Sequence, residues 1–195
     1  MITLAFDTET SGLTLDREKP SHPGQPHLVE LGCILYDDCV ERSSVNLVVH
    51  NPGVDIQTSA SKVHGIVTET AARVGVPLIV ACAVFSNLVK ISDRQVGHNT
   101  QFDLKVMQAQ FHRIGRDFPI TNPLCTKELA EPLCRLPPTE KMIRAGYGHK
   151  FKPPNLTECW RFFFDEDLVG AHGAIVDARA CARVLFEIER RCTNG

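Results

Sequence analysis

Hydrophobic positions in the first fifty residues follow the spacing of β-strands. Residues 2–6 alternate weakly, and residues 45–49 form an apolar run behind a polar turn. Residues 28–36 are apolar on both faces except at Glu30. A run that is apolar on both faces belongs in the middle of a sheet covered on both sides. The pattern therefore predicts a three-stranded meander with residues 28–36 as a buried strand.

Residues 15–27, between the first two predicted strands, contain three prolines and several charges. This composition argues against both strand and helix and predicts a long surface loop beside the end of the first strand. Loops of this length in a compact domain are commonly functional. Two interpretations of this loop remain open: it contacts a substrate, or it is an insertion without a function of its own.

After residues 51–53 the apolar positions recur with helical spacing. Thr100 can cap one of these helices, and Asn155 with Glu158 has the spacing of a capping box. The predicted helices cover residues 60–66, 69–74, 78–91, 100–114, 126–131, 159–163 and 174–191, with a short strand at 95–97. Strands followed by alternating strand and helices predict an α/β protein with a mixed sheet flanked by helices.

The chain has 195 residues, of which 43% are hydrophobic and 23% charged. This composition suits one globular domain over residues 1–195. No run approaches the roughly 20 apolar residues of a membrane span, and the N-terminus has no basic, leader-like region. We therefore expect a soluble, cytoplasmic protein without a membrane partner.

Charge and cysteine content limit the function further. A net charge of −2 argues against binding duplex nucleic acid by broad phosphate neutralisation. It does not exclude a nucleic-acid enzyme, because bound divalent cations reverse the local field of a carboxylate cluster. The eight cysteines form no CxxC pair and no zinc-ligand spacing, which favours reduced and mostly buried thiols.

The candidate chemistry lies in three short segments. Asp7 and Glu9 are two residues apart at the end of the first strand, so both carboxylates can project from one face toward the same ion. A D-x-E triplet alone is common, and Asp103, three residues after Thr100, could instead be part of a helix cap.

The third segment pairs His172 with Asp177. In one continuous helix these residues would point about 140° apart, which makes a shared site awkward. If the helix begins near Ala174, Gly173 allows His172 to lie on an approach loop while Asp177 projects from the first turn. Taken alone, a histidine in a loop is more often a solvated residue.

Together these segments resemble the DnaQ-like 3′→5′ exonucleases of the DEDD superfamily, in the subgroup with histidine, including phage and bacterial exonucleases and polymerase proofreading domains. Asp7 and Glu9 match the first motif, Asp103 the second, and His172 with Asp177 the third. Weaker matches occur at residues 29–32, 63–66 and 155–156, so the resemblance covers most of the chain.

The resemblance implies an RNase H-like fold with a five-stranded mixed sheet. It also implies two Mg²⁺ or Mn²⁺ ions held by Asp7, Glu9, Asp103 and Asp177, with His172 as the general base. The oxygen ligands independently suit these ions rather than zinc. The expected activity is metal-dependent removal of 5′-mononucleotides from single-stranded 3′ ends, with DNA favoured over RNA.

By the same resemblance, the terminal nucleotide would contact Thr8, Thr10, Leu13, His64, Asn99 and Phe102. Four basic residues at 141–152, with Tyr147 and Phe151 between them, could track a single-stranded backbone or form an ordinary solvated surface. Two other functions remain open. One is an RNA-trimming exoribonuclease, and the other is a proofreading or binding module that docks on a DNA polymerase.

Overall fold

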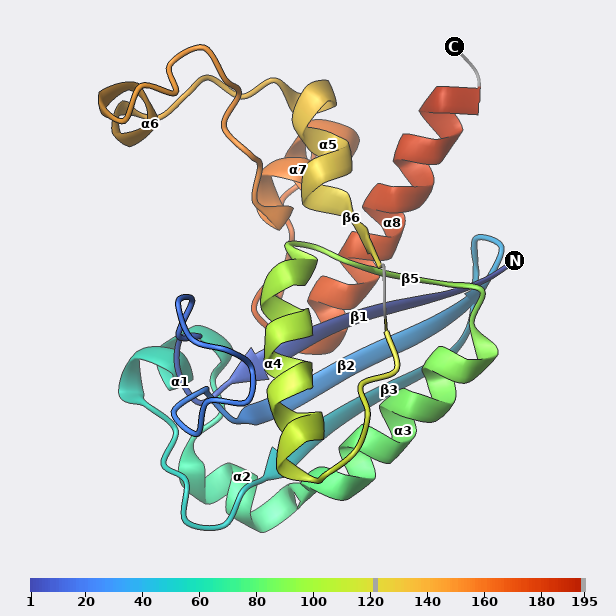
Figure 1. The fold of residues 1–195 in the computed structure, drawn as a ribbon. Coiled ribbons are helices and arrows are strands. Elements are labelled where there is room, and N and C mark those ends of the chain that lie inside the picture. Colours follow the sequence, from blue (N-terminus) through green and yellow to red (C-terminus); the bar gives the residue numbers. More distant parts are fainter. Residues whose placement is uncertain (121–122, 194–195) are drawn as a thin grey trace.

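The computed structural model describes residues 1–120 and 123–193, which form a mixed sheet with helices on both faces (Figure 1). The strands are β1 (Ile2–Thr10), β2 (Leu28–Asp37), β3 (Val40–His50), β4 (Val76–Pro77), β5 (Arg94–Gly97) and β6 (Leu124–Cys125). The helices are α1 (Thr58–His64), α2 (Thr68–Val74), α3 (Leu78–Ile91), α4 (Thr100–Arg113), α5 (Thr126–Cys134), α6 (Glu140–Arg144), α7 (Leu156–Phe164) and α8 (Ala174–Thr193). The predicted α/β class is confirmed.

The strand order across the sheet is β4-β3-β2-β1-β5-β6. β2 pairs antiparallel with both β1 and β3, so the predicted meander and its buried central strand are confirmed. β5 runs parallel to β1, β6 parallel to β5, and β4 parallel to β3. β3 begins at Val40 rather than at residue 45, because its first residues are exposed and pair through the backbone, which an apolar pattern does not reveal.

The sheet has six strands, whereas the family resemblance implied five. The difference lies in its margins, where β4 and β6 contain two residues each. Such short strands are fixed by pairing with a neighbour and leave no periodic signal in the sequence.

The two faces of the sheet are covered by different helices. Leu4 and Phe6 of β1 lie in a core with residues of α3 and α4, whereas Ala5 lies in a second core with residues of α8. Because side chains alternate along a strand, Asp7 and Glu9 face the α8 side, and Thr8 faces α4. The alternation of β1 therefore decides which helix can complete a site around Asp7.

A third core joins α5 and α7 to the C-terminal half of α8. Residues 136–152, here called the basic arm, project from the ends of α5 and α7 (Figure 1). The arm is closed at its base by an isolated antiparallel bridge between Leu136 and Lys152.

Several helix ends differ from those predicted. The N-cap of α4 is Asn99, in the left-handed region with φ of 66°, rather than Thr100. α1 ends at His64 because Gly65 adopts φ of 78° and stops the helix. α5 continues through Pro132 to Cys134, whose side chain is buried against α7 and α8.

Other expectations are confirmed. Asn155 and Glu158 form the capping box of α7, with both reciprocal hydrogen bonds at 2.8 Å. Six of the eight cysteines are buried, and Cys39 and Cys192 are exposed. Within residues 1–120 and 123–193, every helix is too short or too polar to cross a membrane.

Candidate active site

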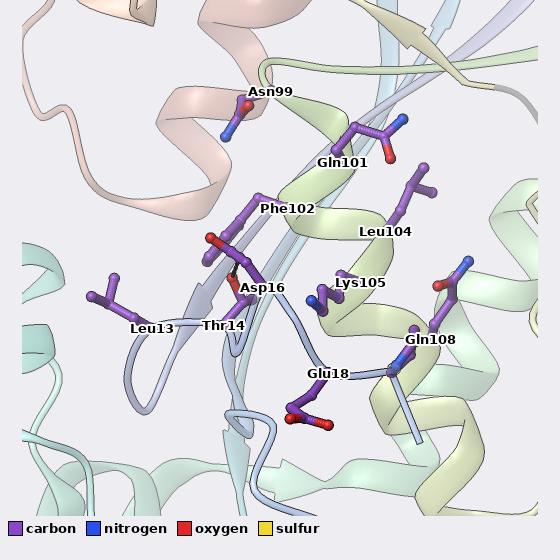
Figure 2. A pocket seen from close by; sticks show the side chains of 11 residues that line it. Leu13, Thr14, Asp16, Glu18, Asn99, Gln101, Phe102, Leu104, Lys105 and Gln108 are labelled. Carbon is purple, nitrogen blue, oxygen red and sulfur yellow. Dashed lines mark hydrogen bonds between the residues drawn. The ribbon is translucent and has the colours of Figure 1, made fainter. Parts of the chain in front are cut away.

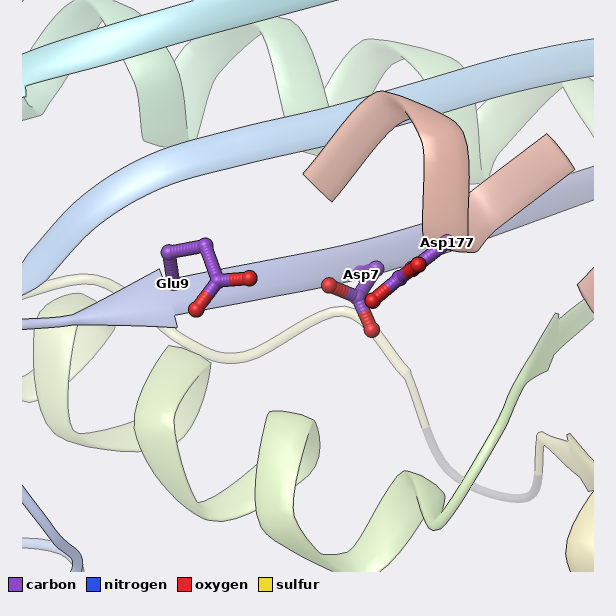
Figure 3. Close-up of side chains that lie close together, drawn as sticks. All are labelled: Asp7, Glu9 and Asp177. Carbon is purple, nitrogen blue, oxygen red and sulfur yellow. The ribbon is translucent and has the colours of Figure 1, made fainter. Parts of the chain in front are cut away.

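Three carboxylates from opposite ends of the chain converge on the α8 face of the sheet. Asp7 and Glu9 project from β1, and Asp177 projects from the first turn of α8 (Figure 3). One carboxylate oxygen from each lies within 4.8 Å of the other two. This spacing lets a divalent cation contact all three oxygens, which are the hard ligands that Mg²⁺ and Mn²⁺ prefer.

The first turn of α8 reaches this position because β2 lets it come close. A Cβ added to Gly32 would lie 2.3 Å from the carbonyl carbon of Ala174, so only glycine allows this contact. Glu30, two residues earlier on the same face of β2, accepts a hydrogen bond of 2.9 Å from the Ala174 backbone N–H. Its other oxygen accepts one of 2.9 Å from the Asn46 amide.

The electrostatics of the cluster favour a bound cation. Burial and the carboxylates of Asp103 and Asp177 raise the pKa of Asp7 well above its usual value. Burial, and next the charge of Asp177, raise the pKa of Glu9 to about 8. Burial also raises the pKa of Asp177, whose Oδ1 is buried without a hydrogen-bond partner in the described structure. A divalent cation would supply both the missing partner and the missing positive charge.

Asp103 lies on the first turn of α4, next to these three carboxylates but outside their group. Its Oδ1 accepts two hydrogen bonds from Thr8, at 3.0 Å from the backbone N–H and 2.6 Å from the hydroxyl. Burial is the main cause that raises the pKa of Asp103, to about 7. These bonds fix the carboxylate against the strand that carries Asp7, and Thr8 is the residue that positions it.

His172 lies on the loop before α8, as predicted, because the helix begins at Ala174. Its own backbone adopts the left-handed conformation, with φ of 69°, so the chain turns at His172 as well as at Gly173. The His172 backbone N–H donates a hydrogen bond of 3.1 Å to Asp177 Oδ2, and the imidazole is exposed. The loop therefore places His172 beside the cluster of Asp7, Glu9 and Asp177, with its side chain exposed to solvent.

A cavity of about 380 Å³ adjoins the carboxylates at Glu9. Four residues predicted to contact the substrate line it, namely Thr10, Leu13, His64 and Phe102. The volume lies in the range of small-molecule sites. α1 also contributes Ser59, Ala60 and Val63 to the wall. Only His64 of this helix was predicted from the sequence as a contact, because no local pattern shows which other side chains of α1 face the cavity.

His64 is held in one orientation. Its Nδ1 accepts a hydrogen bond of 3.2 Å from the Ile66 backbone N–H, so Nε2 carries the proton and donates to the Thr10 carbonyl at 3.2 Å. Burial lowers the pKa of His64 below its usual value, which favours this neutral form. His64 is therefore a fixed, uncharged wall of the cavity.

A second cavity of about 700 Å³ lies between residues 13–20 and α4. Figure 2 shows Asn99 just before α4, and Phe102 and Lys105 along it, opposite the loop that carries Thr14 and Asp16. Leu13 and Phe102 line both cavities, so these two side chains separate neighbouring spaces. Asn99 lines only the second cavity, and its side-chain oxygen accepts a hydrogen bond of 3.1 Å from Lys127.

Residues 15–27 form a surface loop without strand or helix, as predicted. The buried Gln25 side chain holds the loop together, because it bonds to both the N–H and the carbonyl of Leu15 and to the Glu18 and Lys19 carbonyls. α4 then fixes the loop from outside through Lys105 and Arg113. These hydrogen bonds hold the part of the loop that lines the second cavity in a defined conformation.

Glu30 was not predicted as a site residue. The sequence does carry a signal for it, since Glu30 is the single acid in residues 28–36, which are otherwise apolar on both faces. A buried carboxylate normally has a specific partner. The partner, the N-terminus of α8, is 144 residues away and could not be identified from local pattern.

The sequence profile of the RNase T exonuclease family matches residues 4–185. The chain belongs to the RNase T/DnaQ-like exonuclease family. Members of this 3′→5′ exonuclease family are phosphodiester hydrolases. No curated protein sequence matches the chain. The prediction that residues 1–195 form a single domain stays a prediction.

Solved structures share the fold of this family member. E. coli exonuclease I in complex with a dT13 oligonucleotide superposes with a TM-score of 0.77 at 17% identity, over 99% of this chain and 42% of that one. Exonuclease I from Methylocaldum szegediense gives 0.69 at 17% identity, over 97% and 40%. The chain thus spans about two-fifths of the length of these proteins.

Exonuclease X in complex with 5′ overhanging duplex DNA superposes with a TM-score of 0.61 at 19% identity, over 98% of this chain and 93% of that one. At these identities the likeness shows the fold. The expected RNase H-like fold of the DEDD exonucleases is confirmed.

Proposed function

We propose that the chain is a metal-dependent exonuclease that releases 5′-mononucleotides from the 3′ end of single-stranded DNA. The observation that carries this proposal is the convergence of Asp7, Glu9 and Asp177 beside the cavity of about 380 Å³. Family membership supports the reaction class, and a cavity next to three clustered carboxylates supports a nucleotide bound beside metal ions.

Asp7, Glu9 and Asp177 would bind the metal directly, with Asp103 as a further ligand held by Thr8. The unpartnered Oδ1 of Asp177 and the raised pKa values of the carboxylates fit this role. Two Mg²⁺ or Mn²⁺ ions bound there would polarise the scissile phosphate and stabilise the departing 3′ oxygen.

His172 would accept the proton of the attacking water. Its exposed imidazole lies on a loop tied to Asp177 through its backbone, so it can approach the phosphate without occupying a metal position. An imidazole is the side chain that most often accepts a proton in enzymes working near neutral pH.

The terminal nucleotide would occupy the smaller cavity. Thr10, Leu13, His64 and Phe102 line this cavity, with an apolar wall suited to a base or sugar. Asn99 would contact the nucleotide from the α4 side, and Thr8 would act through Asp103 because its hydroxyl is buried and engaged.

DNA is the proposed substrate because structurally similar exonucleases were solved with dT13 and with 5′ overhanging duplex DNA. A DNA polymerase partner stays a prediction.

The test is incubation of the protein with DNA and RNA strands of equal sequence, labelled at the 5′ end, with Mg²⁺, Mn²⁺ or EDTA. We expect a ladder shortened from the 3′ end, 5′-mononucleotide products, and no reaction in EDTA. The variant Asp7→Asn, purified identically, controls for contaminating nucleases. Release of the labelled 5′ nucleotide first would contradict the polarity, and faster cutting of RNA would contradict the choice of DNA.

A further inference from the structure

The basic arm, residues 136–152, combines positive charge with exposed rings. It contains four Lys and Arg residues and one acid, whereas the whole chain has a net charge of −2. Tyr147 is 52% exposed and Phe151 44% exposed, although aromatic residues normally avoid this much contact with water.

Two of the four cations are not neutralised locally. Arg144 pairs with Glu140 at 2.8 Å, and Lys152 pairs with Glu158. Lys141 and Lys150 have no carboxylate within ion-pair distance in the described part of the chain. Lys150 Nζ instead lies 5.3 Å from the centre of the Tyr147 ring, so a free charge and an exposed ring stand side by side.

The root of the arm is tied to the segment that carries candidate site residues. His98 bonds through Nδ1 to the Thr126 hydroxyl at 2.9 Å, and its Nε2 donates to the Pro154 carbonyl at 3.2 Å. Asn99 follows directly and accepts the bond from Lys127 at the start of α5. This network connects the N-terminus of α4, with Asp103 in its first turn, to the start of α5, which leads into the arm, and to Pro154, two residues after the arm ends.

We propose that the basic arm binds single-stranded nucleic acid upstream of the terminal nucleotide, with Lys141 and Lys150 at phosphates and Tyr147 stacked on a base. The inference rests on the proposed function for the identity of the strand. Grooves and projections that hold single strands without sequence preference combine cations with rings in this way. Charge complementarity therefore favours a polyanion with stackable bases over an apolar partner.

The test compares two substrates of different reach. Thymidine 5′-p-nitrophenyl phosphate occupies only the site at the carboxylates, whereas oligothymidylates of increasing length extend to the arm. For the double variant Lys141→Ala/Lys150→Ala we expect KM for long oligothymidylates to rise roughly tenfold at low salt. The slope of log binding constant against log salt concentration should become shallower by about 1.4, because two contacts with single-strand phosphates are lost. Hydrolysis of the nitrophenyl ester should stay unchanged.

Tyr147→Ala tests the stacking contact separately. It should weaken binding of long oligothymidylates roughly tenfold and leave the salt slope unchanged. The matched control is Arg73→Ala/Lys90→Ala, which removes two exposed charges from α2 and α3 at the opposite end of the molecule in Figure 1. If the arm variants bind oligothymidylate as tightly as this control does, the proposal is wrong. If they lose as much affinity for polyglutamate, a polyanion without bases, as for oligothymidylate, the arm does not recognise nucleic acid.

The two proposals fail in different ways. If the unaltered protein hydrolyses neither substrate, the proposed function is wrong, but fluorescence anisotropy of labelled oligothymidylate still measures binding to the arm. If the nitrophenyl ester is hydrolysed and affinity does not increase with oligothymidylate length, only the inference about the arm is wrong.

Discussion

At the scale of single residues, the carboxylates of Asp7, Glu9 and Asp177 are buried so close together that their negative charges would repel one another. Their oxygens lie within 4.8 Å of one another, and burial raises the pKa of each. Such a cluster opposes folding when it is charged and unbound. It is retained in a stable fold more readily if a cation neutralises it.

Replacement of Asp7 separates the effect of the cluster on activity from its effect on stability. For Asp7→Asn we expect activity to fall by roughly three orders of magnitude or more, because a metal ligand is lost. The thermal midpoint in EDTA at pH 8 should not fall, since the substitution removes a repelling charge and keeps the shape. Activity assays and melting curves check both halves. Activity retained at saturating Mg²⁺ would refute the metal-site assignment.

His172→Ala tests the general base. We expect the rate to fall by roughly 10²–10⁴-fold with the Mg²⁺ requirement unchanged, because in the proposed mechanism the imidazole transfers a proton and does not bind metal. The measurements are kcat at several Mg²⁺ concentrations and direct titration of Mn²⁺. A loss of metal affinity as large as the loss of rate would make His172 a ligand.

At the scale of elements, the site depends on how the first turn of α8 meets β2. Glu30 accepts the Ala174 N–H at the positive end of the helix dipole, and Gly32 allows the close approach. Asp177 lies in that same turn, so a shift of the helix start would move one of the three proposed metal ligands.

For Glu30→Ala we expect a loss of roughly 10–100-fold in activity or Mg²⁺ affinity, the usual effect of removing a group that orients a ligand. Glu30→Gln should recover most of it, because the amide oxygen can still accept from Ala174. Glu41→Ala is the control, since it breaks the 2.9 Å pair with Arg179, farther along α8. Equal losses in Glu30→Ala and Glu30→Gln would mean that the charge of Glu30, not its position, matters.

The strands and helices near the chain's strong patterns could be predicted from sequence. β2 was recognisable because its residues are apolar on both faces, and α7 because Asn155 and Glu158 make a capping box. The N-cap of α4 was misplaced at Thr100, because the left-handed conformation of Asn99 follows from its position at the end of β5.

At the scale of the whole molecule, the carboxylate cluster should make stability depend on pH and metal together. The pKa of Glu9 is raised from 4.5 to about 8, so between these values the folded state holds a proton that the unfolded state has lost. The free energy of unfolding therefore falls as pH rises through this range. His98, with its pKa lowered to about 4, acts in the opposite direction, but only below about pH 6.5.

We therefore expect the protein in EDTA to lose stability between about pH 7 and 8, above the range in which His98 acts. Saturating Mn²⁺ should remove most of this loss, because it replaces the protons. Chemical denaturation at each pH, with and without Mn²⁺, measures the effect. Glu9→Gln should make the EDTA curve less steep, while Asp7 and Asp103, whose pKa values are also raised, keep part of the slope. A pH dependence that is the same with and without Mn²⁺ would contradict a metal at this cluster.

The sequence by itself determined the residue types of the site and their local settings. It placed Asp7 and Glu9 on one face of a strand and freed His172 from the helix that carries Asp177, because strand alternation and helix starts are local properties. It also supplied the family, through motifs in three segments.

Only the tertiary structure decided which groups meet. It showed that the carboxylates of Asp7, Glu9 and Asp177 form one cluster. It also showed that Thr8 holds Asp103 beside this cluster and that Glu30 fixes the start of α8. It also brought Ser59, Ala60 and Val63 of α1 to the cavity of about 380 Å³ and tied Pro154, just beyond the basic arm, to His98. These contacts join residues far apart in the chain, and they form through packing of the whole sheet, which no local pattern encodes.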